Sequence, residues 1–300
     1  MLILFIDYLI IFTLSFDFNY IIFISNIYIY KMIKRLTAKI SDFFYSLPRT
    51  LFVDIYRLFI RIRFFNKERL PENKSAILAI NHSTDADPII LLSALKKKIY
   101  FLAESENFES WVTNFFMRKF ANCVPVFKKQ YVKNVKSFRE LFNLSKKNVS
   151  FGIYPEGAIN KKDNFKQFHQ GAAFFSYKTK LPIIPIYLHN TRRAPESKKW
   201  IWTNRITRGI ISIIANTFRK INIFIGEPID PIAENIIKDF EDLANGKGYK
   251  QIIENIHRAL KEEFLELKRE ADDLFGTAVK NMKASDFEDD TEDIVGEEFI

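Results

Sequence analysis

The sequence predicts an α/β protein with a mixed, mainly parallel central sheet flanked by helices. Three short apolar runs, residues 76–80, 149–154 and 181–186, have the length and composition of buried strands. The first run is followed by Asp87-Pro88 and the apolar residues 89–92, a pattern typical of a capped, buried helix with Asp87 as its N-cap. Because open α/β sheets bind ligands at the carboxyl ends of their strands, the polar residues after these runs are candidates for a functional site.

A histidine and a carboxylate follow the first predicted strand, within the run Asn81-His82-Ser83-Thr84-Asp85-Ala86-Asp87. Five residues of regular helix would point the side chains of His82 and Asp87 about 140° apart, so they meet only across a strand-to-helix turn. In that turn Asp87 would hold one imidazole nitrogen while the other faces a substrate hydroxyl as a general base. The alternative is a packed or solvated histidine beside an ordinary helix cap.

A second polar loop follows the run at residues 149–154. Pro155 and Gly157 end that strand in a tight turn, and Glu156 lies between them. Asn160 and Lys161 come shortly afterwards, so a carboxylate and several donors would gather at the same edge of the sheet. Taken alone, this loop is also consistent with a simple turn and a solvated glutamate.

The order and spacing of these segments resemble the glycerolipid acyltransferases, the superfamily of the 1-acyl-sn-glycerol-3-phosphate (lysophosphatidate) acyltransferases. The family motif Asn-His-x-x-x-x-Asp is matched by Asn81, His82 and Asp87, and the core of Phe-Pro-Glu-Gly-Thr-Arg-Ser is matched by residues 154–157. A later apolar strand with prolines near both ends is matched by residues 181–186. The likeness covers roughly residues 65–230.

The resemblance implies an O-acyltransferase of phospholipid biosynthesis. Such an enzyme moves a fatty acyl group from acyl-CoA or an acyl-carrier protein to a lysophospholipid hydroxyl, and the expected acceptor is 1-acyl-sn-glycerol 3-phosphate. His82 would be the general base and Asp87 would orient it, with no covalent acyl-enzyme, no cofactor and no metal. The residues expected to bind the substrates are Asn81, Lys128, Lys129, Glu156, Gly157, Asn160 and Lys161.

Two departures from the family pattern leave the acceptor open. Ile159 stands where the family commonly has an arginine that contacts the acceptor's phosphate, and Lys128-Lys129 replaces an Asp-Arg pair. Lysine offers a point charge in place of the planar bidentate fork of arginine. Another lysophospholipid or glycerol 3-phosphate is therefore the alternative acceptor. From a different functional class, a non-catalytic basic protein that binds anionic membranes also fits the charge.

The net charge indicates a polyanionic partner. The formal net charge of the chain is +9. Residues 285–300 hold eight acids and no Lys or Arg, so the net charge of residues 1–284 is +9 plus 8, about +17. Either an anionic membrane surface or nucleic acid would attract such a charge. The resemblance implies the membrane, together with the lysophospholipid and the acyl donor, and no nucleic acid is expected.

Cysteine and histidine usage excludes two kinds of site. The single Cys123 rules out a disulfide within the chain and suits a reducing compartment. Histidines occur only at positions 82, 169, 189 and 257, a spacing that is not typical of metal ligands.

The N-terminal region suggests membrane attachment. Residues 1–31 are apolar but interrupted by Asp7 and Asp17, so they are interpreted either as one transmembrane span or as a wrongly assigned start ahead of Met32. Aromatic residues and arginines are interleaved from Ile40 to Phe65 and predict either interfacial helices or a helix pair packed on the catalytic domain, and the family resemblance favours the interfacial helices. The expected location is the cytoplasmic face of the cell membrane, with peripheral, monotopic or single-span attachment. The predicted parts are an apolar segment (1–31), amphipathic helices (32–65), a catalytic domain (66–232), C-terminal helices (233–284) and an acidic disordered tail (285–300).

Overall fold

The computed structural model describes residues 27–33, 36, 49–72, 74–126, 139–147, 149–160, 165, 167–194, 205–233, 248–276 and 288–289. The chain divides into two compact units, residues 1–50 and 51–300. Residues 27–33 of the first unit form a helix with exposed side chains. No helix in the described ranges combines the length and the apolar character needed to cross a membrane. The rest of the predicted apolar segment, residues 1–26, lies outside the described residues.

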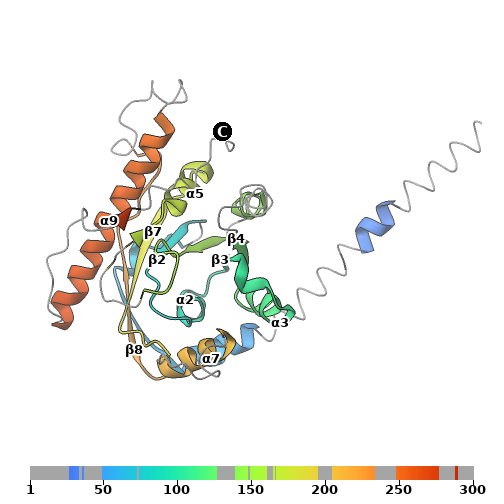
Figure 1. The fold of residues 1–300 in the computed structure, drawn as a ribbon, viewed down its shortest axis with the longest axis horizontal. Coiled ribbons are helices and arrows are strands. Elements are labelled where there is room, and N and C mark those ends of the chain that lie inside the picture. The colour runs from blue at the N-terminus through green and yellow to red at the C-terminus, as the bar shows by residue number, and fades with distance from the viewer. Residues whose placement is uncertain are drawn as a thin grey trace, which may run out of the picture. The chain divides into compact units, whose positions relative to one another are not determined.

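The second unit is built on a seven-stranded sheet in the order β1-β8-β7-β2-β5-β3-β4 (Figure 1). Every neighbouring pair is parallel except β7 and β8, which run antiparallel. The predicted mixed, mainly parallel sheet is therefore confirmed. Its strands are β1 (Arg61–Phe65), β2 (Ile77–Ile80), β3 (Ile99–Glu104), β4 (Cys123–Val126), β5 (Ser150–Ile153), β7 (Ile183–His189) and β8 (Lys220–Ile225).

Helices cover both faces of this sheet. Buried residues of α5 and α9 join the core on one face, and those of α2 and of the helix formed by residues 51–59 join the core on the other. Strands β2 and β5 lie between these two cores and are buried along their whole length, which explains why their sequences read as continuous apolar runs. The helices are α2 (Asp87–Leu95), α3 (Trp111–Phe115), α5 (Gly171–Thr179), α7 (Arg205–Asn216) and α9 (Gly248–Phe275), with shorter turns η1 (Lys67–Arg69), η2 (Ser105–Phe108) and η3 (Phe116–Phe120).

The prediction that interfacial helices extend to Phe65 is wrong at its end. The helix stops at residue 59, and residues 61–65 form β1, which pairs with β8 in parallel at the edge of the sheet. Arg61 and Arg63 alternate with Ile62 and Phe64 at a period of two, which is the pattern of a strand with one solvated face. The sheet therefore begins five residues before the predicted start of the catalytic domain.

The C-terminal part is described at two places. One helix, α9, spans Gly248–Phe275 within the region where helices were predicted. The acidic tail lies outside the described residues except for Glu288–Asp289, which form a two-residue strand, β9, beside β6 (Gln167–Phe168). At these two residues the expected disorder gives way to backbone pairing.

Candidate active site

The two polar motifs meet because β2 and β5 are parallel neighbours in the sheet. Their carboxyl ends lie at the same edge, so the chain after Ile80 and the chain after Ile153 leave the sheet side by side. Two hydrogen bonds join these segments. The backbone N–H of His82 donates to Oε1 of Glu156 at 2.8 Å, and the backbone N–H of Asn160 donates to the carbonyl oxygen of His82 at 2.7 Å.

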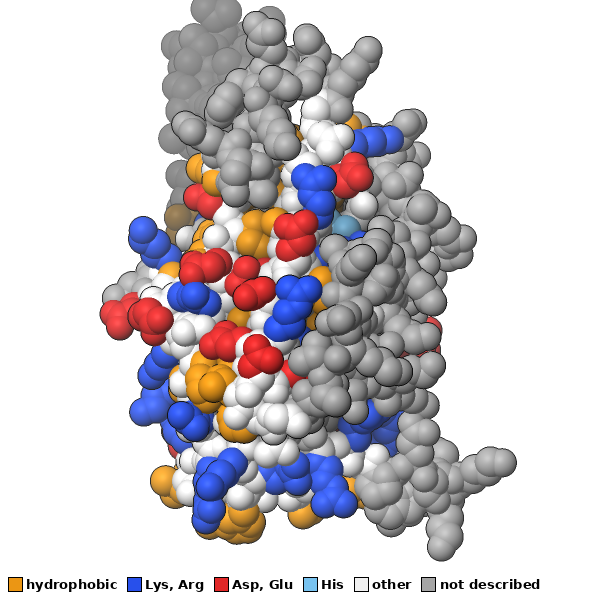
Figure 2. Space-filling model, turned by 90° about the vertical axis from the view of Figure 1, so that its left-hand side faces the viewer, with side chains coloured by type: hydrophobic (Ala, Val, Ile, Leu, Met, Phe, Trp, Pro, Cys, Tyr) orange, Lys and Arg blue, Asp and Glu red, His pale blue; other side chains and the backbone are white. Residues whose placement is uncertain are grey.

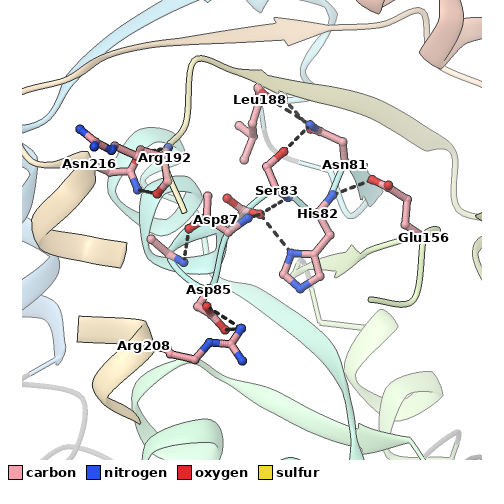
Figure 3. A network of polar contacts seen from close by, with 12 residues as sticks. Asn81, His82, Ser83, Asp85, Asp87, Glu156, Leu188, Arg192, Arg208 and Asn216 are labelled. Atoms are coloured by element: carbon pink, nitrogen blue, oxygen red, sulfur yellow. Dashed lines mark hydrogen bonds and ion pairs between the residues drawn. The ribbon is translucent and has the colours of Figure 1, made fainter. Parts of the chain in front are cut away.

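His82 and Asp87 form the predicted pair (Figure 3). Nδ1 of His82 lies 3.0 Å from Oδ2 of Asp87. The same oxygen accepts the backbone N–H groups of Ser83 at 2.8 Å and Thr84 at 2.9 Å, so three donors converge on it. The Asp87 side chain is fully buried while that of His82 is 18% exposed, and Nε2 lies on the side of the ring away from the carboxylate. This arrangement orients an imidazole whose second nitrogen is able to accept a proton.

Asp87 is not the N-cap that the sequence predicts. Ala86 holds that position, and Asp87 is the first residue of α2, followed by the expected proline in the first turn. Its carboxylate turns back to the loop before the helix because His82 and the N–H groups there are its donors. Burial raises the pKa of Asp87, while the hydrogen bond and the charge of His82 and the backbone N–H groups of Thr84 and Ser83 act to lower it.

Tyr154 covers the imidazole. Its ring lies 4.1 Å from that of His82, centroid to centroid, with 24° between the planes, and the ring of Phe101 lies 6.1 Å from that of Tyr154. The phenol oxygen is buried and has no hydrogen-bond partner among the described residues. Burial, with Asp87 and Cys123 nearby, raises the pKa of Tyr154 well above its usual value. Sequence reasoning matched Tyr154 to a motif but gave it no contact with His82.

Glu156 accepts a hydrogen bond from the backbone of His82, and its predicted contact with a substrate stays a prediction. Its side chain is buried and Oε1 accepts the N–H of His82. Burial raises its pKa to about 7, against the lowering effect of the hydrogen bonds from His82 and from the Asn160 side chain. Glu156 therefore fixes the backbone at His82, and Asn160 holds Glu156 and the His82 carbonyl in turn.

The pKa of Glu156 predicts a pH-dependent stability. A folded-state pKa of about 7, above the ordinary 4.5, means that the proton-linked stability is full below pH 4.5 and is lost as the pH rises through 7. At about 1.4 kcal/mol for each pKa unit, the loss is on the order of 3 kcal/mol. We expect urea unfolding from pH 5 to 8 to show this loss in the native chain but not in Glu156→Gln. Parallel pH profiles for the two proteins would contradict the assignment.

Gly157 is required by the backbone of its turn. Its φ is +67°, and its N–H donates to the carbonyl oxygen of Tyr154 at 3.0 Å. A Cβ at this position would lie 2.7 Å from the ring of His169, which is too close for a side chain. His169 therefore lies beside the motif loop. The sequence analysis did not predict this position for it.

Asn81 joins two strands through its side chain, and the predicted substrate contact stays a prediction. Its side chain is 4% exposed, and its Oδ1 accepts the N–H of Leu188 at 2.7 Å. Its Nδ2 donates to the carbonyl oxygen of Leu188 at 3.1 Å and to Oγ of Ser83 at 3.0 Å (Figure 3). One amide thereby joins the end of β2 to β7 and to residues 81–87, the candidate catalytic turn, and its polar atoms are occupied.

Asn81→Ala should destabilise the fold. The change would leave the buried N–H and C=O of Leu188 without partners, at a cost of about 2–4 kcal/mol. Chemical denaturation measures this, and Asn81→Asp, which puts a buried carboxylate oxygen against the Leu188 carbonyl oxygen, should also be destabilised. An unchanged unfolding midpoint with a raised KM for the acceptor would instead support the prediction that Asn81 contacts the substrate.

Three predicted residues are not described by the structure, and one ion pair beside the site was not predicted. Lys128, Lys129 and Lys161 lie outside the described residues. Nη2 of Arg208, on α7, lies 3.1 Å from Oδ2 of Asp85 in the catalytic turn, a pair separated by 123 residues that no local pattern indicates. Within the described ranges, no three His, Cys, Asp or Glu side chains are placed together to hold a metal ion.

Comparisons with known proteins find similarity to acyltransferases. The chain is 25% identical to a probable 1-acyl-sn-glycerol-3-phosphate acyltransferase of Mycoplasma pneumoniae over 66% of this chain and 75% of that protein. It is 24% identical to the 1-acyl-sn-glycerol-3-phosphate acyltransferase of Bacillus subtilis over 67% and 87% of the two chains. The crystal structure of the 1-acyl-sn-glycerophosphate acyltransferase PlsC from Thermotoga maritima aligns with a TM-score of 0.44 at 20% identity, covering 72% of this chain and 82% of that one.

A model of the acyltransferase family matches residues 61–189, from the first residue of β1 to the last residue of β7. The matched segment contains both motif loops and therefore His82, Asp87 and Glu156. Over this segment the chain is similar to the acyltransferase family.

Proposed function

We propose that this acyltransferase moves a fatty acyl group from an acyl thioester to the hydroxyl of 1-acyl-sn-glycerol 3-phosphate, giving phosphatidate. The observation that carries the chemistry is the 3.0 Å contact between Nδ1 of His82 and Oδ2 of the fully buried Asp87. That contact leaves Nε2 as the basic atom of a partly exposed imidazole. A thioester is already activated, so the reaction needs a positioned base more than it needs an enzyme nucleophile.

The proton follows one route in this mechanism. As the acceptor oxygen attacks the thioester carbonyl carbon, Nε2 of His82 takes the hydroxyl proton. The tetrahedral intermediate then collapses, the carbon–sulfur bond breaks, and the imidazolium returns the proton to the departing thiolate. Asp87 stabilises the imidazolium charge during both steps, and Glu156 holds the backbone from which the ring projects. The products are the new oxygen ester and a free thiol.

The proposed acceptor rests on the names of two relatives, a probable 1-acyl-sn-glycerol-3-phosphate acyltransferase and a 1-acyl-sn-glycerol-3-phosphate acyltransferase. Ile159, a partly exposed residue next to Asn160, cannot offer a phosphate the fork of an arginine. The alternative acceptors are another lysophospholipid and glycerol 3-phosphate. The proposed donors are acyl-CoA and an acyl-carrier protein, and no cofactor or metal has a step in the mechanism.

The proposed place of action is an anionic membrane at its cytoplasmic face. The support is the basic charge of the chain and the lipid nature of the proposed substrates. Peripheral or monotopic attachment and a single N-terminal span are both compatible with this proposal.

Acyltransfer from labelled acyl-CoA to a panel of lysolipids, in detergent and beside His82→Ala, tests the function. We expect product with 1-acylglycerol 3-phosphate that disappears in the variant. If product forms only with a different acceptor, the result would support the mechanism and identify that acceptor as the substrate. Absence of thiol release with every acceptor, for both acyl-CoA and acyl-carrier-protein donors, would favour the non-catalytic membrane binder.

A further inference from the structure

Helix α7 turns its polar side inward and its apolar side outward. Ser212 and Asn216 are fully buried, whereas Ile210 and Ile214 are 53% and 66% exposed. Asn216 exchanges two hydrogen bonds of 2.8 Å with the backbone of Arg192, which explains why this side of the helix faces the protein (Figure 3). An amphipathic helix normally packs its apolar stripe on the core. The outward isoleucines of α7 therefore indicate an apolar environment outside the molecule.

A second exposed apolar stripe lies beside α7. Residues 51–59 form a helix that contacts α7 through Tyr56, whose hydroxyl donates to the carbonyl oxygen of Ile213 at 3.2 Å. The rings of Phe59 and Phe218 meet edge to face at 5.7 Å. We define the two-helix face by its exposed apolar residues, Ile55, Leu58, Phe59, Ile210, Ile214 and Phe218.

Phe218 combines an unfavourable backbone conformation with an exposed side chain. It has a positive φ of 65°, an unfavourable conformation for a residue with a large side chain, and yet the side chain is 63% exposed. Its N–H donates to the carbonyl oxygen of Phe59, so the two aromatic residues are fixed to each other. A strained residue that gains little burial within the protein points to a function at the surface.

Basic residues border the two-helix face. Arg61 and Lys220 are exposed and are register partners at the first positions of β1 and β8, directly after the face ends at Phe59 and Phe218. Residues 58–67 and 217–226 contain no Asp or Glu. Figure 2 shows basic and hydrophobic side chains together along the lower edge of the molecule, the end where α7 lies in Figure 1. Apolar residues rimmed by cations complement a bilayer surface that carries anionic headgroups.

The two-helix face is joined to the catalytic turn. Arg208 of α7 pairs with Asp85, three residues after His82. On the other helix, Oγ of Ser93 in α2 donates to the carbonyl oxygen of Val53 at 3.4 Å. The helix that carries Asp87 and the turn that carries His82 therefore both contact elements of this face.

We propose that the two-helix face docks on a bilayer containing anionic phospholipids, with Ile210, Ile214 and Phe218 entering the boundary between headgroups and acyl chains. The assignment deepens the proposed function, since an enzyme that acylates a lipid must approach a bilayer. Docking at this face brings the catalytic turn to the lipid surface through Arg208 and Asp85.

A site-specific fluorescent label tests the docking directly in the full chain. Cys123 is buried, and burial raises the pKa of its thiol to about 12, so an introduced surface cysteine is the reactive one. Ile214→Cys would carry a polarity-sensitive nitrobenzoxadiazole dye. We expect a blue shift with vesicles of phosphatidylcholine and phosphatidylglycerol, and a weaker one with phosphatidylcholine alone. The matched control is Leu274→Cys on α9, which is 55% exposed and should show no shift. No shift at position 214, or equal shifts at both positions, would overturn the proposal.

Vesicle flotation provides a second measurement. Ile210→Gln with Ile214→Gln should lower the partition coefficient for acidic vesicles about tenfold or more, because two apolar side chains no longer leave water. Ile232→Gln with Leu274→Gln, at 54% and 55% exposure, is the matched control and should bind like the native chain. Equal binding of both double variants would reject the proposal. So would a native dimer that only the α7 variant dissociates in sedimentation without lipid, since a second copy would then cover the face.

Neither measurement requires turnover. Loss of the proposed acyltransfer activity in every assay would leave the docking result standing, and the two proposals fail separately. The α7 double variant should also keep its activity on short-chain, water-soluble substrates, where no bilayer is involved.

Discussion

His82→Ala should lower kcat/KM for acyltransfer by about 10² to 10⁴, the range that a positioned general base contributes. The loss corresponds to about 3–5 kcal/mol of transition-state stabilisation. The reason is geometric, because Asp87 holds the imidazole of His82 through Nδ1 and leaves its Nε2 for the acceptor hydroxyl. Steady-state kinetics with labelled acyl thioester measure the effect.

A matched histidine variant distinguishes chemistry from general damage. His189 lies at the end of β7, where its ring stacks on Phe275 at 4.9 Å, away from the Asp87 carboxylate. His189→Ala should retain activity, while His82→Ala loses it with little change in the unfolding midpoint. Near-native turnover in His82→Ala would reject the base assignment, and equal losses in both variants would reduce it to a packing effect.

Asp87→Asn should lower kcat by about 10 to 10³ with the fold retained. The N–H groups of Ser83 and Thr84 and Nδ1 of His82 all converge on Oδ2, so the amide oxygen of the variant should take that place and keep the ring orientation. The change removes the negative charge that stabilises the imidazolium. It also puts an amide nitrogen at Oδ1, which is buried without a partner among the described residues.

The kinetic pattern separates this role from substrate binding. A charge that acts only on the imidazolium affects kcat and leaves the acceptor KM nearly unchanged. Asp87→Ala, which removes the acceptor for three donors, should cost more activity than Asp87→Asn and also destabilise the turn. A raised acceptor KM with native kcat in Asp87→Asn would show that the carboxylate contacts the substrate instead.

The contact between His82 and Asp87 was predictable because every feature that forms it is local. An apolar run of five residues is followed by Asn81, Pro88 lies in the first turn of the next helix, and the turn between them has room for His82 and Asp87 to meet. The same reasoning identified β5 and β7 from short apolar runs bounded by Pro and Gly. It failed at β1, where arginines that alternate with apolar residues along a strand edge were interpreted as part of an interfacial helix.

The sequence by itself determined the α/β class, the central strands and the His82–Asp87 pair, since these depend on apolar periodicity and turn chemistry within a few residues. Only the tertiary structure decided what Asn81, Glu156 and Arg208 do. Their partners are Leu188, His82 and Asp85, which lie 107, 74 and 123 residues away along the chain. Hydrogen bonds over such separations form only after the sheet has brought its strand ends together, and burial then raises the pKa of Glu156 and turns the amide of Asn81 inward. No local pattern carries that information, because the same side chains in an open loop would bind water.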